Sequence, residues 1–488
     1  MSRAGLYMKA DVIIVGAGLA GLVAAIEASS HRAGALVLDK LPPPAEWNAV
    51  SFLPGGIGND TFRSGGGGLA RFSEGTLVEH LHNGSEQIQA GRSPLDILLQ
   101  RHMEWGWGAV DTHLLRTYCS RIFDDCCWLR DELGMPYDES GRTVRGLGIG
   151  LYQCLYQAAA SRGVQMMFRT TARELLTDSS GHVRGVRAAH EEQMIDIEAN
   201  AVILATGGFQ GNRDMLMQHV GPAIARNVQM VGSPDNTGDG HVMAQALGAQ
   251  MRHLGVCHIR TTDIYFGQGP SRYLAHIYPM GVYFNERYER FVDEGIADSD
   301  TVANAIAYQP GSAAGLIFDA KARARYPKEY ENYPRREQLI NVAGSLEELA
   351  LKMHVSPQPL KKMISEFNAS IKDGTSSGPN VPKTASAYPI DTAPFYGFYP
   401  VRPALNHTLG GLAVNGSDCH VLNVEGEPIP GLYAAGTVVN WAFGQPYQVG
   451  AVTSYRGSYH AGATSGAGIA LVFGRLAGQQ AAWVTRRA

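Results

Sequence analysis

The chain has 488 residues, a formal net charge of −4, and 58 glycines. This length is too great for one compact domain and allows two or three. The slightly acidic balance gives no electrostatic case for a nucleic-acid partner. No run approaches the roughly 20 apolar residues of a membrane span, so we expect no integral membrane segment.

Residues 10–40 predict a nucleotide-binding turn. The apolar run 12–15 is typical of a buried parallel strand, and Gly16, Gly18 and Gly21 then follow the pattern G-x-G-x-x-G. The first glycine makes a tight turn, the second lets the backbone approach a pyrophosphate, and the third lets helix and strand pack closely. A second strand ends before Asp39, whose carboxylate is placed to accept ribose hydroxyls. We therefore predict that the phosphates lie at the start of the helix.

Residues 41–75 are rich in proline and glycine and include the run Ser64–Gly68. Loops of this length inside compact domains are usually functional. The segment is either a flexible linker or, as we expect, backbone that meets a flat ring. Farther along, residues 113–133 predict a helix with an apolar core stripe that stops at Gly134. Residues 164–200 alternate like strands, and residues 201–204 predict another buried strand.

The end of the chain repeats features of its beginning. The segment PIPGLYAAGTVV and the helix-like GIALVFGRLAGQQAAW come some four hundred residues after the glycine turn. One nucleotide-binding domain is therefore predicted to form from both ends, with the middle inserted. This organisation is typical of two-domain flavoproteins, which makes FAD the expected cofactor.

Six cysteines occur without a C-x-x-C pair, a haem-attachment motif or a disulfide framework. We interpret them as reduced thiols of a cytoplasmic protein, and we expect no metal site. Electrons must then leave through an external acceptor: a quinone, oxygen or a carrier protein.

Seven motifs occur in an order that resembles the fumarate reductase/succinate dehydrogenase flavoprotein superfamily. They are DVIIVGAGLAGL, LATGGF, NTGDG, ERFVDE, NHTLGG, GLYAAG and VFGRLAG. The 3-ketosteroid dehydrogenase and tricarballylate dehydrogenase branches are the most similar. The resemblance implies an α/β fold in which a Rossmann-like FAD-binding domain, residues 1–251 and 393–488, is interrupted by an α+β capping domain, residues 252–392. Residues 51–64 contain no histidine of the kind that attaches FAD covalently in this family, so we expect non-covalent FAD.

The resemblance also implies a set of cofactor contacts in the glycine turns and at strand ends. These are Gly16, Ala17, Gly18, Leu19, Ala20, Gly21, Asp39, Lys40, Ser64, Gly65, Gly66, Gly67, Gly68, Ala205, Thr206, Gly207, Gly208, Asp239, His407, Gly436, Thr437, Gly466, Ala467 and Gly468. Thr437 stands where the family often has an acid that reaches the cofactor. The amides at the start of the last helix, Gly466–Gly468, can stabilise negative charge on the reduced flavin.

Other positions depart from the fumarate reductases that the chain resembles. Those enzymes have a proton-donating arginine where this chain has Asp298, and a substrate-binding histidine where it has Asn406. Their N-R-L-G-G segment, which supplies a carboxylate-binding arginine, is absent. Fumarate reduction is therefore disfavoured.

The segment SYHAGATSGAG resembles the part of 3-ketosteroid dehydrogenases that binds the ketone oxygen. There a tyrosine hydroxyl and a backbone amide stabilise an enolate, and Tyr459 and the amide of Ala463 would be the equivalents. Tyr459 could equally be an ordinary half-buried aromatic residue, and Tyr447 and Tyr455 compete for the same role.

Two further side chains carry open alternatives. Asp298 could abstract the alpha proton if burial raised its pKa, or it could belong to a solvated acidic loop. Arg456 could bind a substrate carboxylate bidentately, or it could be a surface arginine.

We therefore expect an FAD-dependent dehydrogenase that introduces a C=C bond alpha,beta to a carbonyl. The expected substrate is a small molecule, a cyclic ketone that is steroid-like or has a smaller ring. One alternative is an ene-reductase or a dehydrogenase that acts on a carboxylic acid of the fumarate or tricarballylate kind. Another is a flavin carrier subunit without turnover.

Overall fold

A computed structural model gives the structure of residues 8–46, 90–105, 111–136, 144–145, 147–191, 193–230, 233–261, 278–296, 299–325, 340–378, 380–439 and 466–486. Its central sheet has six strands in the order β20 (His420–Leu422), β21 (Pro428–Ala434), β8 (Ala201–Leu204), β2 (Val12–Val15), β3 (Ala35–Leu38) and β4 (Gln165–Met167). All neighbours pair in parallel except β20 and β21. Strands β2, β3 and β8 are buried at every position, as the apolar runs predicted.

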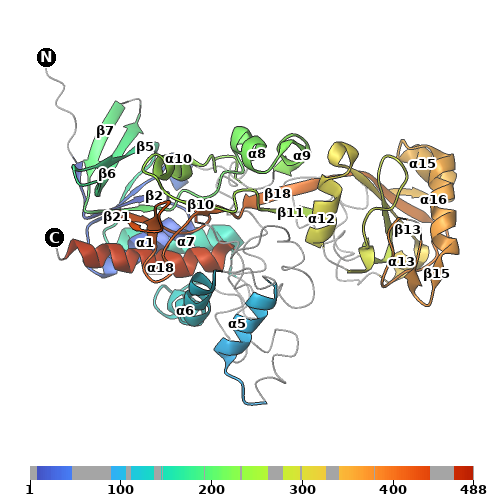
Figure 1. The fold of residues 1–488 in the computed structure, drawn as a ribbon, viewed down its shortest axis with the longest axis horizontal. Helices are drawn as coiled ribbons and strands as arrows, with labels where there is room; N and C mark the ends of the chain where they lie inside the picture. The colour runs from blue at the N-terminus through green and yellow to red at the C-terminus, as the bar shows by residue number, and fades with distance from the viewer. Residues whose placement is uncertain are drawn as a thin grey trace.

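Both ends of the chain contribute to this sheet. Strand β21 pairs with β8, and β8 pairs with β2 in register Val12 to Ala201. Helix α18 (Gly466–Thr485) lies along α1 (Leu19–Ser30), and α7 (Leu147–Ser161) also packs on α1 (Figure 1). The two helices approach closely, and their contact requires glycine in α18. A side chain at Gly478 would collide with the backbone of Ala24. The prediction of one fold built from both ends is confirmed.

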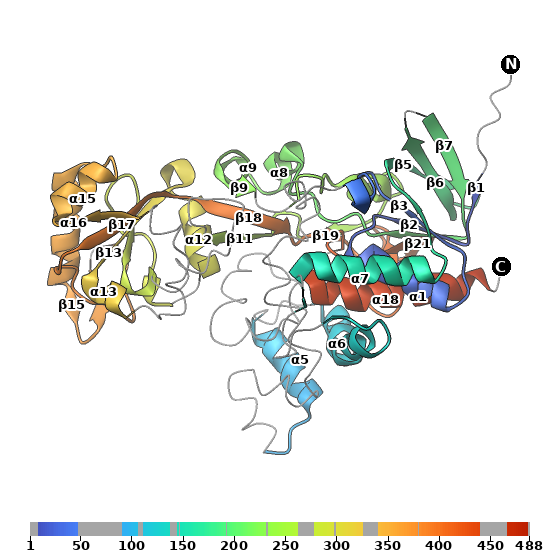
Figure 2. The same cartoon turned by 180° about the vertical axis from the view of Figure 1, so that it is seen from behind.

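A second sheet covers the face of the central sheet that lies opposite helices α1 and α18. Its order is β1 (Met8–Lys9), β7 (Gln193–Glu198), β6 (Val183–His190) and β5 (Thr170–Thr177). Strand β6 contacts both β8 and β21, whereas the helices α1, α7 and α18 lie on the other side (Figure 2). Below these helices lie α6 (Thr112–Asp131) and α5 (Pro94–Trp105). Asp111 caps α6 by accepting hydrogen bonds from the amides of His113 and Leu114, each at 3.1 Å.

A narrow middle section joins this part of the molecule to the rest. Its sheet has the order β11 (Cys257–Thr261), β18 (Pro403–Thr408) and β9 (Gln229–Met230). Helices α8 (Arg213–His219), α9 (Pro222–Asn227) and α12 (Ser299–Ala307) belong to the same section. Helix α10 (Asp239–Gln245) and the pair β10 (Met251–Arg252) and β19 (Gly411–Leu412) lie toward the central sheet.

The far end of the molecule has its own sheet and cores. The strand order is β12 (Val282–Phe284), β13 (Ala314–Asp319), β17 (Phe395–Val401) and β14 (Asn341–Ala343). The helices here are α13 (Ala320–Ala324), α15 (Leu346–Lys352) and α16 (Pro357–Ala369), and β15 (Ile371–Lys372) pairs with β16 (Thr375–Ser376). Four short 3₁₀ turns complete the described structure: Pro44–Glu46, Tyr278–Met280, Glu294–Ile296 and Pro310–Ser312.

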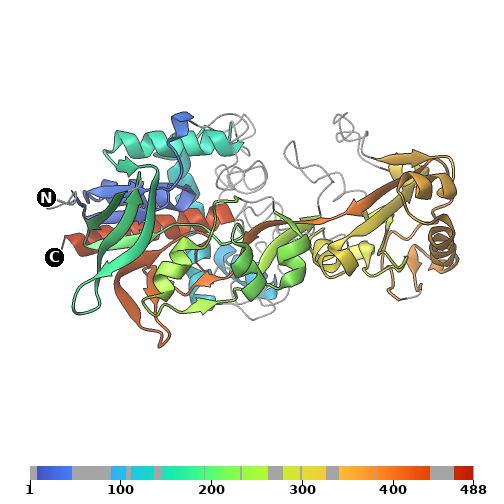
Figure 3. The same ribbon diagram turned by 90° about the horizontal axis from the view of Figure 1, so that it is seen from above.

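The molecule is elongated because β17 and β18 run one after the other from the far sheet toward the central one (Figure 3). Separate buried clusters lie beside the central sheet, in the middle section and on each face of the far sheet. The α/β flavoprotein fold is confirmed. The domain boundaries at residues 252 and 392 stay a prediction.

Candidate functional site

The carboxyl ends of β2 and β8 form the centre of the candidate cofactor site. The chain leaves β2 toward β3 on one side, and β8 pairs with β2 on the other, which makes this the point where strand order reverses. Ligands of open α/β sheets bind at such points. The two strand ends are joined directly, because the amide of Ala205 donates to the carbonyl of Val15 at 2.8 Å.

The surroundings of the three glycines in the turn differ, so glycine is required at each position for a different reason. Gly16 has a φ of +109°, and a side chain there would collide with the carbonyl of Ala205. A side chain at Gly21 would collide with the carbonyl of Gly16. A Cβ at Gly18 would meet no protein atom within 4 Å, although this residue begins α1.

The open space at Gly18 fits a phosphate group. It lies at the positive end of a helix dipole, where backbone amides favour an anion. The first turn of α1 contains no acidic residue that would repel one. The turn therefore fits the pyrophosphate of FAD.

Asp39 ends β3 beside the same turn. Its carboxylate accepts hydrogen bonds from the amides of Ala17 at 2.7 Å and Leu41 at 2.8 Å, one on each oxygen. Burial raises the pKa of the Asp39 carboxyl above its ordinary value, and these two amides oppose the rise. Each carboxylate oxygen has a further lone pair, so Asp39 can still accept ribose hydroxyls.

Lys40 connects the end of β3 to the NTGDG motif. Its ammonium group donates to Thr237 Oγ1 and to Asp239 Oδ2, each at 2.7 Å. The Thr237 hydroxyl in turn donates to Asp239 Oδ1 at 2.9 Å. The side chain of Lys40 is 28% exposed and that of Asp239 is 30% exposed. The structure thus brings together three parts of the predicted nucleotide side: the β3 end, the NTGDG motif and, through Asp39, the glycine turn.

The LATGGF segment packs tightly between two other motifs. Gly207 has a φ of +75°, and its Cα faces the side chain of Asn236. The hydroxyl of Thr206 lies against Gly240 and is buried without a hydrogen-bond partner among the described residues. Buried polar atoms of this kind call for an explanation such as a bound ligand, and Thr206 therefore fits a cofactor contact.

Strand β18 brings the NHTLGG motif to this segment. The amide of Phe209 donates to Thr408 Oγ1 at 3.1 Å, and both residues are fully buried. Asn406 and His407 precede Thr408 in the same strand, and His407 pairs with His258 of β11. The backbone of the predicted flavin contact His407 therefore lies next to the LATGGF segment.

The C-terminal motif ends at the same edge of the sheet. Gly436 follows β21 with a φ of +80°, and the amide of Ala435 donates to the carbonyl of Leu204 at 2.9 Å. Thr437 is partly exposed there. Helix α18 begins at Gly466 and continues through Ala467 and Gly468, without an acidic residue in its first turn.

The remaining predicted residues lie outside the described part of the chain. They are Ser64, Gly65, Gly66, Gly67, Gly68, Asp298, Tyr447, Tyr455, Arg456, Tyr459 and Ala463. Their proposed contacts, and non-covalent attachment of FAD, stay predictions.

The ERFVDE motif has a structural role that the sequence did not reveal. Arg290 Nη2 and Glu294 Oε2 form a buried ion pair at 2.6 Å, and the other oxygen of Glu294 accepts the amide of Tyr283 at 2.8 Å. Lys383 lies 3.8 Å from Glu294 and is fully buried. Burial lowers the pKa of the Lys383 ammonium to about 8, against the attraction of Glu294. Truncating one member of such a cluster leaves a charge buried and uncompensated.

A second buried charge cluster braces the helices below the central sheet. Arg475 of α18 donates to Asp125 at 2.6 Å and to Glu27 at 3.2 Å, and it stacks over Trp128. Burial raises the pKa of the Asp125 carboxyl to about 6, and Arg121 and Arg475 oppose the rise. No periodic pattern in the sequence predicts this cluster, because its members come from three helices that are far apart along the chain.

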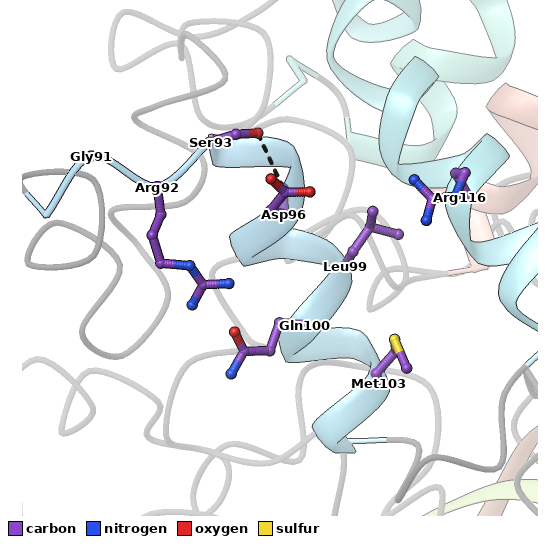
Figure 4. A pocket seen from close by; sticks show the side chains of 8 residues that line it. All are labelled: Gly91, Arg92, Ser93, Asp96, Leu99, Gln100, Met103 and Arg116. Atoms are coloured by element: carbon purple, nitrogen blue, oxygen red, sulfur yellow. Dashed lines mark hydrogen bonds between the residues drawn. The ribbon is translucent and has the colours of Figure 1, made fainter.

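A hollow of about 820 Å³ lies away from these motifs, along α5 (Figure 4). Its lining includes Arg92, Asp96 and Arg116, and Ser93 Oγ accepts the amide of Asp96 at 3.3 Å as a helix cap. None of its lining residues belongs to the predicted site, and we assign it no ligand.

Within the described ranges, no group of three or more histidine, cysteine or acidic residues could hold a metal ion. The helices of the same ranges include none long and apolar enough to cross a membrane. A cytoplasmic location stays a prediction.

Comparison with protein families identifies the group to which this arrangement belongs. Residues 11–49 and 83–454 match the model described as FAD binding domain. The chain belongs to this family. The predicted superfamily resemblance and the FAD cofactor are thereby confirmed.

Curated relatives are similar along most of the chain. An NADH:fumarate oxidoreductase of Klebsiella pneumoniae is 27% identical over 97% of this chain. A urocanate reductase of Eggerthella lenta is 27% identical over 88% of this chain and 70% of its own length. A fumarate reductase (cytochrome) of Shewanella frigidimarina is 25% identical over 98% of this chain and 78% of its own length. The chain spans about half, 47%, of the Klebsiella protein. The prediction of an FAD-dependent oxidoreductase agrees with these names.

Solved structures share the fold. The open conformation of a flavocytochrome c3 fumarate reductase matches with a TM-score of 0.72 and 24% identity, over 98% of this chain and 79% of that one. A 3-ketosteroid delta1-dehydrogenase from Sterolibacterium denitrificans matches with a TM-score of 0.71 and 19% identity, over 97% of this chain and 99% of that one. The same fold therefore occurs in proteins named as reductases and as dehydrogenases, and it does not select between the two.

Proposed function

We propose that the protein is an FAD-dependent oxidoreductase that acts on a carbon–carbon bond next to a ketone carbonyl. The favoured direction is alpha,beta-dehydrogenation of a cyclic ketone. Family membership and the fit of the glycine turn, Asp39 and Thr206 support the cofactor. The electron acceptor is proposed to be an external quinone, oxygen or a carrier protein.

One observation carries the choice of a ketone. Asp298 and Asn406 stand where the fumarate reductases that the chain resembles have an arginine and a histidine. A carboxylate and a neutral amide provide no positive charge for a dicarboxylate substrate. A neutral ketone needs none, because hydrogen-bond donors at its oxygen are sufficient.

The proposed mechanism assigns each step to a group of this chain. The glycine turn and Asp39 hold the pyrophosphate and the ribose, and Lys40 fixes Asp239 beside them. Asp298 removes the alpha proton, and Tyr459 and the amide of Ala463 donate hydrogen bonds to the developing enolate oxygen. FAD held by these residues would supply the acceptor for the hydride that leaves the beta carbon. Two donors at the oxygen lower the barrier because charge develops there only as the proton leaves.

The test of this function uses Tyr459→Phe with a panel of cyclic ketones. We expect the wild-type flavin to bleach anaerobically with a ketone and not with di- or tricarboxylates. The variant should keep FAD and lose turnover roughly 100-fold, the scale of one lost oxyanion donor. Turnover should fall more than substrate affinity.

Tyr447→Phe and Tyr455→Phe are the matched controls, since each removes one hydroxyl from the same segment. If one of them loses activity while Tyr459→Phe keeps it, the role belongs to that tyrosine. If all three stay active and Arg456→Ala is inactive, the ketone proposal is wrong and the substrate is a carboxylate.

The names of the relatives favour a second candidate, reduction of a C=C bond. Besides fumarate and urocanate, they include vinyl phenol and acrylate reductases. In this case dithionite-reduced protein should be reoxidised by an enoate or another activated alkene. A third possibility is a flavin carrier without turnover. In that case no ketone and no di- or tricarboxylate should support steady-state reduction of an artificial acceptor such as dichlorophenolindophenol.

A further inference from the structure

Gln210 follows the LATGGF motif and differs from its neighbours in one respect. The residue is 3% exposed, and its side-chain oxygen Oε1 is buried with no hydrogen-bond partner among the described residues. A buried amide oxygen without a donor is costly, and most such groups in folded proteins are satisfied. The sequence motifs assign this residue no role.

Backbone hydrogen bonds hold the segment on both sides of Gln210. The amide of Gly211 donates to the carbonyl of Asn236 at 2.8 Å, and the amide of Asn212 donates to the carbonyl of Phe209 at 2.9 Å. Phe209 itself is bonded to Thr408. Gln210 therefore lies in a buried segment whose flanking backbone is held in place, and not in an exposed loop.

The side chain of Gln210 lies beside Gly208, next to Thr408 of β18. A Cβ built on Gly208 would lie 2.7 Å from Gln210 Oε1 and would collide with the Thr408 hydroxyl. Thr408 follows His407, the predicted flavin contact on β18. The pyrophosphate turn lies at the other end of the segment, where Ala205 meets Gly16. The segment thus runs from the glycine turn toward β18, with Gln210 at the β18 end.

We propose that Gln210 is a cofactor-positioning residue whose amide oxygen accepts a hydrogen bond from the flavin half of FAD. That half offers the donors it needs, the N3–H of the isoalloxazine ring and the ribityl hydroxyls. A side-chain amide also carries a donor beside its acceptor, which matches the N–H and carbonyl pair at the pyrimidine edge of the ring. The inference requires FAD binding alone and is independent of the substrate proposed above.

The experiment compares Gln210→Leu with wild type as FAD-free protein, using two ligands. FAD should bind about tenfold more weakly to the variant, because one flavin donor is left buried without an acceptor. ADP carries the adenosine and pyrophosphate parts without the flavin, so its affinity should not change. The visible absorption of the bound flavin should also shift, since a hydrogen bond to the ring is lost.

Gln309→Leu is the matched control. That glutamine follows α12, where its amide nitrogen donates to the carbonyl of Ala305 at 3.1 Å and its amide oxygen accepts from Asn285 at 3.1 Å. Its loss should leave the affinity for both ligands unchanged. Equal weakening of FAD and ADP by Gln210→Leu would show a general effect on the fold and overturn the proposal. Unchanged FAD affinity together with an unchanged spectrum would overturn it as well.

Discussion

Single residues at the glycine turn separate the needs of the fold from those of the cofactor. Gly21 is required by protein atoms, since a side chain there meets the backbone of Gly16. Gly18 has an extended φ of −73°, which any residue adopts, and open space above it. No protein atom near Gly18 excludes a side chain, so we attribute its glycine to the bound ligand, and a spacing motif alone does not distinguish the two cases.

Gly18→Val and Gly21→Val should therefore fail in different ways. Gly18→Val should abolish FAD binding, because the new side chain occupies the place of the pyrophosphate. Its FAD-free form should unfold within about 0.5 kcal/mol of the wild-type FAD-free form. Gly21→Val should lose roughly 1–3 kcal/mol or more from overpacking.

Retained flavin after gel filtration and urea unfolding of the FAD-free proteins measure the two effects. Unfolding must be compared without FAD, because a bound ligand itself adds stability. A Gly18→Val protein that still retains stoichiometric FAD would contradict the assignment of the pyrophosphate site.

At the scale of elements, the regular parts of the fold were predictable and the connections were not. The apolar runs predicted β2, β3 and β8, and the 113–133 stripe predicted α6, because burial on both faces or on one stripe leaves a clear period. Strands β9 and β11 left no such signal. Strand β9 has two residues, and β11 pairs with a partner nearly 150 residues away. Their pairing depends on contacts that no local pattern encodes.

In the candidate site, too, residues within recognisable motifs were predictable, and residues without a local pattern were not. The resemblance supplied Asp39, Thr206 and Asp239, which the structure places around two neighbouring strand ends. The sequence did not predict the role proposed here for Gln210, nor the structural cluster of Arg290, Glu294 and Lys383. A lone polar residue after a motif has no periodicity, and the contact of Lys383 with Glu294 joins segments far apart in sequence.

Helix α10 contains a histidine whose burial opposes its protonation. His241 is fully buried, its ring stands edge-on to Phe209 at 5.4 Å, and neither ring nitrogen has a hydrogen-bond partner among the described residues. Burial and, to a smaller extent, nearby His219 lower the pKa of His241 to about 4, against the opposing effect of Asp239. Between pH 6.5 and 4 the unfolded chain therefore binds a proton that the folded protein excludes, so stability falls as the pH falls.

From this we expect the free energy of unfolding to be about 2 kcal/mol lower at pH 5 than at pH 7 through His241 alone. His241→Leu should remove this part of the pH dependence, because leucine has no proton to gain and suits the apolar surroundings of Phe209. Urea unfolding at the two pH values measures the difference. His113→Gln, at an exposed position, serves as the control and should keep the wild-type pH dependence. An unchanged dependence in His241→Leu would show that this histidine is not responsible.

For the whole molecule, the pairing of both chain ends places one dinucleotide turn at the centre of one sheet. The turn at Gly16–Gly21 is the one G-x-G-x-x-G that the sequence places between a buried strand and a helix. Two of the relatives, an NADH:fumarate and an NADH:acrylate oxidoreductase, are about twice as long as the part this chain matches, with 47% and 50% of their lengths covered. The chain thus corresponds to about half of proteins whose names include a nicotinamide donor.

We therefore expect NADH and NADPH to reduce the flavin of this chain slowly, if at all. With FAD in the single turn, no second fingerprint remains to hold a nicotinamide dinucleotide against the ring. Anaerobic stopped-flow bleaching of the flavin measures the rate with each nucleotide. Dithionite is the positive control, since it should bleach the same sample completely and thereby show that the flavin is bound and reducible. Rapid bleaching by either nucleotide at stoichiometric concentration would contradict the prediction. It would mean that the nicotinamide binds through contacts other than a glycine turn and that electrons enter this protein from NAD(P)H rather than from the organic substrate.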